Sequence, residues 1–243
     1  MKQSVKPNPN NPETKKKQVT KMFNGISRSY DTLNRIITLG VDVLWRKRVV
    51  REIQKHKHDV LLDIATGTGD LVIALSKLKT KKIIGLDISP GMLEIGKQKV
   101  KAVGLDQRID MQLGDSEALA YDDNTFDGVT IAFGVRNFEH LDLGLQEICR
   151  VLKPKGTLVI LETAVPQNPI LKSLYSFYTQ KVMPFIGKMF SKNRTAYQYL
   201  SDSAAAFPCG KAFHNILKKN GFISIEDFPQ TLGVASIYVG KKP

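Results

Sequence analysis

Short apolar runs recur along the middle of the chain and are separated by longer amphipathic segments. The runs cover residues 60–64, 82–86, 109–113, 128–133 and 157–162. Between them, apolar positions follow helical spacing and predict helices over about 70–77, 90–102 and 141–152. Short apolar strands that alternate with helices are typical of a parallel sheet with helices on both faces. Because such crossovers are right-handed, we expect a doubly wound α/β fold.

The first part of the chain departs from this alternation. Residues 1–17 are rich in Asn, Pro and Lys, which predicts a flexible basic leader. Residues 18–57 contain two helical stretches, one from about Thr20 and one from Asp42 to Lys55. We expect these two stretches to form an N-terminal helical cap in front of the sheet.

The alternation also stops after Glu162. The apolar, aromatic and basic segment 163–205, interrupted by Pro184 and Gly187, predicts a helical lid or insertion after the fifth strand. The chain then continues with one helix and two strand-like runs that are close enough to pair as antiparallel neighbours, at about 210–219, 222–227 and 234–239. We therefore expect a single domain over residues 18–243, built on a mostly parallel seven-stranded sheet.

Composition agrees with one globular domain. Of 243 residues, 42% are hydrophobic and 24% are charged, which excludes collagen-like and wholly disordered chains. No apolar run approaches the ~20 residues that cross a bilayer, and the charged N-terminus lacks the apolar stretch of a secretory signal. The two cysteines, Cys149 and Cys209, and the four histidines show no disulfide or metal-binding spacing. We expect a cytoplasmic protein without a metal.

Basic residues are concentrated in two segments. The chain has 36 Lys and Arg against 23 Asp and Glu, a formal charge of +13. Residues 1–60 hold fourteen basic and five acidic side chains, and residues 163–201 hold five basic and no acidic ones. This asymmetry indicates an anionic partner, either a membrane surface or a nucleic acid, although basic runs can also serve solubility alone.

A glycine-rich turn, DIATGTGD over residues 63–70, follows the first predicted strand. In open α/β sheets, ligands bind at the carboxyl ends of the strands. Gly67 and Gly69 allow positive φ and a close approach of the backbone to a ligand. Asp87 ends the next strand, where a carboxylate can accept hydrogen bonds from both hydroxyls of a ribose. The sequence therefore predicts a nucleoside site.

The residues around the turn indicate which nucleoside it binds. A dinucleotide turn needs a third glycine where Val72 stands, and Asp63 and Asp70 would repel a pyrophosphate. S-adenosylmethionine carries a sulfonium and an ammonium group and no phosphate, so these carboxylates suit it. Asp115 and Ser116 follow the third strand, where they can reach the edge of the adenine. We therefore expect S-adenosyl-L-methionine as the cofactor.

Several motifs resemble a known family. DIATGTGD, GLDIS and GDSEAL are similar to the cofactor motifs of class I S-adenosylmethionine-dependent methyltransferases. Three further segments resemble the signatures of the menaquinone/ubiquinone biosynthesis C-methyltransferases: YDTLN at 30–34 continuing to Trp45, FGVRN at 133–137, and RVLKPKG at 150–156 running to Glu162. The resemblance covers about residues 18–243. It implies that the cofactor contacts Thr66, Asp87, Asp115 and Ser116.

The chain departs from the usual family pattern at a few positions. Members of the family usually have Met, Ser and His where Leu33, Thr38 and Asp42 stand. The change at Asp42 removes a titratable ring, so we assign that position no catalytic role. Some members have a cofactor-contacting serine where Ala132 stands, and an alanine side chain cannot form that hydrogen bond.

Methylation of a quinol ring carbon sets the remaining chemical requirements. Loss of a phenolic proton pushes electron density onto the neighbouring carbon, so the site needs a partner for the phenolate and a proton acceptor. We expect Arg136 to stabilise the phenolate, Asn137 to orient the same oxygen, and Asp70 to act as the base, directly or through water or Arg136. The competing interpretation of Arg136 is a surface salt bridge with Glu139 or Asp142.

The capping segments suggest how the substrate is held. Tyr30 is expected to wall the substrate pocket, and its alternative role is ordinary packing. In the segment 163–205, helical spacing joins Leu171, Leu174, Tyr178, Val182 and Phe185, accompanied by Lys172, Lys181, Lys188, Lys192 and Arg194. The alternative is a core-facing helix, but aromatic and basic residues without acids are typical of an interfacial segment on anionic lipid.

Together these features predict C-methylation of a reduced prenylated quinone, with demethylmenaquinol as the expected substrate and the ubiquinone-pathway benzoquinol as the close alternative. The enzyme is expected to lie peripherally on the inner face of the cell membrane. The positive charge suggests an RNA methyltransferase as a rival interpretation. RNA cytosine methyltransferases carry their nucleophile in a Pro-Cys pair after the fourth strand, whereas the Pro-Cys pair that ends at Cys209 lies past the fifth strand. We therefore expect no nucleic acid as a partner. A non-catalytic cofactor-binding protein is a third alternative. The sequence leaves a homo-oligomer open.

Overall fold

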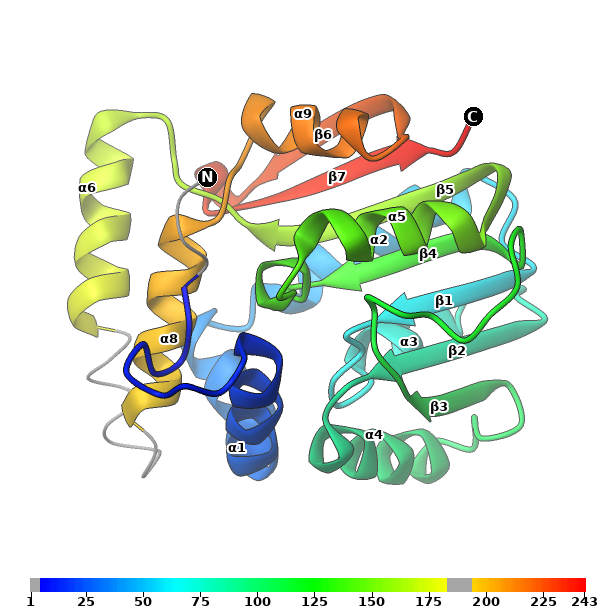
Figure 1. The fold of residues 1–243 in the computed structure, drawn as a ribbon, viewed down its shortest axis with the longest axis horizontal. Helices are drawn as coiled ribbons and strands as arrows, with labels where there is room; N and C mark the ends of the chain where they lie inside the picture. Colours follow the sequence, from blue (N-terminus) through cyan, green and yellow to red (C-terminus); the bar gives the residue numbers. More distant parts are fainter. Residues whose placement is uncertain (1–4, 183–193) are drawn as a thin grey trace.

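A computed structural model describes residues 5–182 and 194–243. In this part of the chain, seven strands form one sheet in the order β3-β2-β1-β4-β5-β7-β6 (Figure 1). The strands are β1 (Val60–Ile64), β2 (Lys82–Asp87), β3 (Ile109–Leu113), β4 (Phe126–Ala132), β5 (Leu152–Thr163), β6 (Ile223–Gln230) and β7 (Ala235–Lys241). Strands β1 to β5 are parallel, whereas β7 runs antiparallel between β5 and β6. The predicted seven-stranded, mostly parallel sheet is confirmed.

Helices cover both faces of this sheet (Figure 1). On one face, α5 (Leu141–Val151) and α9 (Lys211–Lys219) share a core with the strands. On the other face, α2 (Asp42–Gln54), α3 (Asp70–Leu75) and α4 (Pro90–Ala102) complete a second core. Because apolar side chains are needed on both faces, β1 and β4 are buried almost along their whole length.

A third group of helices lies at the carboxyl end of the parallel strands (Figure 1). It consists of α1 (Lys15–Ile37), α6 (Pro169–Phe177) with a following π-helical turn (Tyr178–Val182), and α8 (Arg194–Ala206). Helices α1 and α8 share a small core with Met92 of α4. The elements before the first strand and after the fifth strand therefore meet over the edge of the sheet where ligands bind.

Some element boundaries differ from those expected from sequence. Helix α1 begins at Lys15 instead of about Thr20, because the side chain of Thr14 caps it by accepting a hydrogen bond from the backbone N–H of Lys17. Strands β4 and β5 begin earlier than expected because Phe126 pairs with Leu152 before the apolar runs start. Several residues noted in the predicted insertion lie outside the described residues: Pro184, Phe185, Gly187, Lys188 and Lys192.

Three further features concern the described ranges 5–182 and 194–243. No helix in them combines the length and the apolar character needed to cross a membrane. They also contain no group of three or more His, Cys, Asp or Glu residues that could hold a metal ion. Cys149 and Cys209 are both free thiols.

Candidate active site

The turn after β1 is shaped to admit a ligand. Gly67 and Gly69 have φ angles of 57° and 82°, in the left-handed region that favours glycine. A Cβ atom added to Gly67 would meet nothing within 4 Å, so its backbone borders open space. Gly67 lines a cavity, here called the edge cavity, together with Asp87, Asp115 and Ser116. Four of the predicted cofactor residues therefore converge on one space.

Asp87 is a mostly buried carboxylate that lines the edge cavity. Its two oxygens accept hydrogen bonds from the backbone N–H groups of Gly67, at 2.7 Å, and Ser89, at 2.8 Å. Burial raises the pKa of Asp87 to about 6, and these backbone hydrogen bonds limit the increase. A carboxylate oxygen can accept more than one hydrogen bond, so Asp87 retains capacity for a ligand hydroxyl.

Three predicted cofactor residues lie behind the cavity wall instead of lining it. Asp63 is buried and accepts a hydrogen bond from the hydroxyl of Thr130 at 2.6 Å, and burial raises its pKa to about 7. Thr66 is buried, and its backbone N–H donates to the carbonyl of Leu86. Gly69 begins α3 as its N-cap. The positions of these residues support the turn, and their direct contact with a cofactor stays a prediction.

Helix α1, which belongs to the predicted N-terminal cap, forms the opposite wall of the edge cavity. Lys16, Val19, Phe23 and Tyr30 of this helix line the cavity. The ammonium of Lys16 lies 2.6 Å from a carboxylate oxygen of Asp115. The sequence predicted the cap and the role of Tyr30, but it did not indicate the contact between Lys16 and Asp115, because contacts between residues so far apart depend on tertiary structure.

The first residue of α1 also holds the loop after β4. The ammonium of Lys15 donates hydrogen bonds to the carbonyl oxygens of Arg136 and Phe138, at 2.8 and 2.9 Å. Its backbone N–H donates to a carboxylate oxygen of Glu139 at 3.0 Å. Burial lowers the pKa of Lys15 to about 8. Glu139, one of the suggested surface partners of Arg136, is thus used by Lys15.

Arg136 is buried and paired with an acid on the neighbouring strand. One of its terminal nitrogens donates to Glu162 at 2.6 Å and to the carbonyl of Phe133 at 2.9 Å. The side chains of Arg136 and Glu162 are 7% and 0% exposed, so this is not the surface salt bridge considered from sequence. Burial alone would lower the pKa of the guanidinium, but the charge of Glu162 raises it above its ordinary value. The Nε of Arg136 is buried without a hydrogen-bond partner among the described residues.

Arg136 lines a second, larger space, here called the apolar cavity, of about 610 Å³. Most of its wall is apolar or aromatic, including Trp45, Leu171 and Tyr175. A volume within about 300–1,000 Å³ and a mainly apolar lining are typical of small-molecule sites. Tyr30 and Phe133 line both cavities, so the two spaces share a wall.

Asn137 stands on the other side of this shared wall. It lines the edge cavity, its amide nitrogen donates to the carbonyl of Phe133 at 3.3 Å, and its carbonyl oxygen accepts from the hydroxyl of Tyr199 at 3.1 Å. Burial raises the pKa of Tyr30, which favours a neutral phenol beside both cavities. The structure therefore brings Tyr30, Arg136 and Asn137 together around Phe133.

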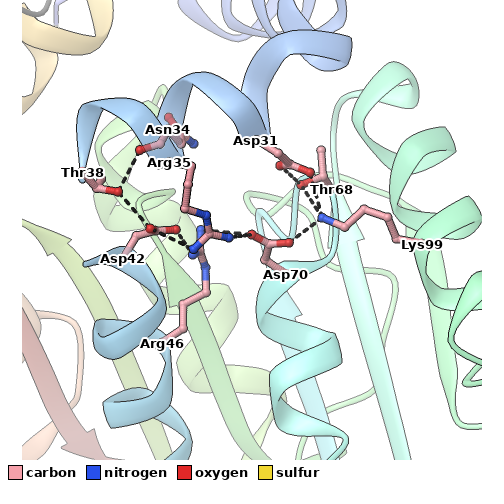
Figure 2. Close-up of polar contacts among 9 residues, drawn as sticks. All are labelled: Asp31, Asn34, Arg35, Thr38, Asp42, Arg46, Thr68, Asp70 and Lys99. Carbon is pink, nitrogen blue, oxygen red and sulfur yellow. Dashed lines mark hydrogen bonds and ion pairs between the residues drawn. The ribbon is translucent and has the colours of Figure 1, made fainter. Parts of the chain in front are cut away.

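Asp70 lies in a cluster of charged side chains that joins α1 and α2 to the glycine turn (Figure 2). It is ion-paired with Lys99 of α4 and lies 3.6 Å from a guanidinium nitrogen of Arg46 and 3.9 Å from one of Arg35. Burial alone would raise the pKa of Asp70, but the charges of Arg46, Lys99 and Arg35 hold it below its ordinary value. Asp70 lines neither cavity. Its predicted role as a base stays untested, and this geometry favours a positioning role.

The same cluster fixes the cap on both sides of Asp70 (Figure 2). Lys99 also binds the carboxylate of Asp31 at 2.8 Å, and Asp31 accepts a hydrogen bond from the hydroxyl of Thr68 at 2.5 Å. On the other side, Asp42 accepts from Thr38 at 2.8 Å and is ion-paired with Arg46. Thr38 and Asp42, two positions where the chain departs from the family pattern, thus contact each other.

The donors and acceptors of the edge cavity fit S-adenosylmethionine. Asp87 and Asp115 offer carboxylates, and the backbone at Gly67 is open to close approach. Lys16 is the one cation among the described residues that line the cavity, and it is paired with Asp115 and Glu117. Within this described lining, no cation is therefore free to neutralise a pyrophosphate, which agrees with a phosphate-free, cationic nucleoside.

Similar solved structures share this fold. One is a phosphoethanolamine N-methyltransferase 2 of Haemonchus contortus, with a TM-score of 0.62 and 17% identity over 91% of this chain and 60% of that one. Another is a SAM-dependent methyltransferase of Aquifex aeolicus, with a TM-score of 0.59 and 18% identity over 82% of this chain and 89% of that one. At these identities the likeness concerns the fold alone.

Several proteins are much more similar to this chain in sequence than these solved structures are. A protein of Bacteroides fragilis named demethylmenaquinone methyltransferase is 39% identical over 99% of this chain and 98% of its own length. A protein of Geotalea daltonii named ubiquinone/menaquinone biosynthesis C-methyltransferase UbiE is 43% identical over 94% of this chain and 97% of its own length. The model of the ubiE/COQ5 methyltransferase family matches residues 11–242. The chain belongs to the ubiE/COQ5 methyltransferase family.

Proposed function

We propose that this chain transfers the methyl group of S-adenosylmethionine to a ring carbon of demethylmenaquinol. The geometry that supports this reaction is the pair of adjoining cavities. One offers carboxylates and an open glycine backbone to a nucleoside, and the other offers an apolar volume of about 610 Å³ with a buried guanidinium. The names of the two relatives support the same chemistry.

Arg136 and Glu162 provide the centre of the proposed mechanism. When bound, S-adenosylmethionine supplies an electrophilic methyl group. Glu162 keeps the guanidinium charged and fixed, and Arg136 lines the apolar cavity, where its positive charge can face a quinol oxygen. As the phenolic proton leaves, negative charge grows on that oxygen, and a buried cation stabilises it more than water would. The overall change is one new carbon–carbon bond, one broken carbon–sulfur bond and one broken ring carbon–hydrogen bond. S-adenosylhomocysteine is the leaving group, the ring hydrogen departs as the net proton released, and the quinol oxygen is reprotonated.

The aromatic walls and Asn137 position the reactants. Tyr30 and Phe133, which border both cavities, place a flat ring on the apolar side against the nucleoside on the other side. Asn137 is held by Phe133 and Tyr199 and can orient the reacting end of either ligand. Such positioning contributes several kcal/mol to catalysis, up to about 7–11 kcal/mol in the best intramolecular cases.

The location of the enzyme follows from its substrate. A prenylated quinol resides in the bilayer, so we propose a cytoplasmic enzyme that associates peripherally with the inner face of the cell membrane. The absence of acids over residues 163–201 supports attraction to anionic lipid.

Incubation with methyl-labelled S-adenosylmethionine and membrane lipid extract tests the function. The expected product is labelled menaquinone, identified by mass spectrometry after reoxidation. Parallel reactions with demethylmenaquinol and with the ubiquinone-pathway benzoquinol determine which ring is accepted. A protein that binds the cofactor but methylates neither ring would refute the proposal.

A further inference from the structure

Four exposed apolar side chains surround the mouth of the apolar cavity. Leu39, Leu174, Phe177 and Leu232 all line this cavity, yet they are 83%, 62%, 64% and 73% exposed. Residues that are both lining and exposed mark the place where a cavity opens to solvent. We call these four residues the rim. They come from three separate segments: the turn between α1 and α2, helix α6, and the turn between β6 and β7.

The two rim leucines in turns occupy unfavourable backbone conformations. Leu39 and Leu232 have φ angles of 51° and 59°, in the region where Gly and Asn are normally found. Each turn therefore combines backbone strain with an apolar side chain exposed to water, and either cost would be avoided by Asn or Gly. A surrounding medium that accepts apolar side chains offsets the exposure.

Helix α6 is apolar on two sides. Leu171 and Tyr175 of α6 and Tyr178 of the following π-helical turn, at i, i+4 and i+7, line the cavity. Ile170, Leu174 and Phe177, with the same spacing, are more than 60% exposed. Leu174 and Phe177 reach the cavity only at its mouth, and Ile170 does not line it, so the apolar surface of α6 extends beyond what closing the cavity requires. The second stripe therefore needs a partner.

We infer that the rim and the exposed stripe of α6 insert into an anionic phospholipid bilayer, and that the prenyl chain of the substrate enters the cavity between them. This inference rests on the proposed function, because it assumes a substrate with an isoprenoid tail. The rim is continuous with the apolar cavity, so a tail can pass from lipid into protein without crossing water. Lys172 on α6 is exposed, and α6 and the following π-helical turn carry no acid, which complements anionic headgroups.

Vesicle flotation with the full chain tests the docking surface. Vesicles of phosphatidylglycerol and phosphatidylethanolamine should retain the wild-type protein, and part of the binding should persist at high salt because apolar insertion is not screened. Leu39→Asn and Leu232→Asn should each weaken binding by about tenfold, the effect of removing one leucine from an apolar environment. Asn tolerates positive φ, so both variants should fold. Val103→Asn, at an exposed apolar residue that does not line the cavity, is the matched control and should bind as wild type.

Ile170→Gln separates docking from chemistry, because Ile170 is 72% exposed and does not line the cavity. This variant should turn over a soluble demethylmenaquinol with a single isoprene unit as fast as wild type. With a long-chain demethylmenaquinol embedded in vesicles, its kcat/KM should fall by about tenfold. The inference is overturned if the three variants bind vesicles as wild type does, or if they convert a dimer to a monomer without affecting vesicle binding. Failure of wild type on the soluble quinol would instead reject the proposed function itself.

Discussion

The Arg136–Glu162 pair allows stability and catalysis to be separated by mutation. The two side chains are 7% and 0% exposed, and the joining hydrogen bond is 2.6 Å long. Removing one partner of a buried ion pair typically costs about 3–5 kcal/mol, because the other charge stays buried without compensation. Removing both charges while keeping the volume is often close to neutral. Arg136→Met should therefore destabilise strongly, and the double variant Arg136→Met/Glu162→Gln should recover most of the loss.

Glutamine suits this test because it retains a carbonyl oxygen. Glu162 accepts hydrogen bonds from the backbone N–H and the hydroxyl of Thr163, at 2.7 and 3.1 Å, and the side chain introduced by Glu162→Gln could still accept them. A domain of this kind has about 5–15 kcal/mol of stability. The single variant would thus lose a large part of its stability, and urea unfolding measures the difference as a shift of the midpoint.

Turnover should respond differently from stability. Both variants lack the cation that stabilises the phenolate, so kcat should fall by about 100- to 1,000-fold in each, equal to about 2.7–4 kcal/mol. Cofactor affinity should change little, because Arg136 does not line the edge cavity. Urea unfolding, calorimetric titration and initial methyl-transfer rates measure the three quantities. Recovery of turnover in the double variant, or an Arg136→Met protein as stable as wild type, would refute the reasoning.

Three other predictions concern the cofactor side. Burial raises the pKa of Asp87 to about 6. Because the ionised carboxylate accepts hydrogen bonds with both oxygens, cofactor affinity should fall as the pH drops through about 6. If the pH dependence of cofactor affinity, measured by calorimetry, stays the same in Asp87→Asn, this prediction is wrong. Lys99→Met should weaken cofactor binding severalfold. The stability loss should be about 1 kcal/mol or less, because the ion pairs of Lys99 with Asp31 and Asp70 are partly exposed. Lys97→Met, at an exposed residue of the same helix, is the control, and equal effects of the two variants on cofactor binding would show that the charged cluster does not support the cofactor site. Asp70→Asn should raise KM for the cofactor and leave the pH dependence of kcat unchanged. Loss of the acidic limb of the profile, the fall in kcat at low pH, would instead assign Asp70 as the base.

The central strands could be predicted from sequence because their apolar runs are continuous. The predicted ranges 60–64 and 109–113 agree with β1 and β3 residue for residue. The starts of β4 and β5 could not be predicted, because Phe126 and Leu152 are brought into the sheet by pairing with each other. Helix α1 had a visible cap in Thr14, but the surrounding Asn, Pro and Lys residues obscured it.

The candidate site could be predicted only in part. Gly67 and Asp87 follow neighbouring strands, so the topology alone brings them together. The partner of Arg136 was missed because Glu162 lies 26 residues later on an adjacent strand. The covering role of Lys16 was missed for the same reason, since Asp115 lies 99 residues away. These contacts depend on where helices pack over the sheet edge, which a single sequence does not specify.

Transfer of a labelled methyl group to a defined ring carbon tests the central claim most directly. Purified protein would be given S-adenosylmethionine with a carbon-13 methyl group and chemically reduced, short-chain demethylmenaquinol, and the product would be examined by NMR. The account predicts the label as a methyl group on the quinone ring carbon next to a ring oxygen. Label on a ring oxygen, or binding of both ligands without transfer, would contradict it.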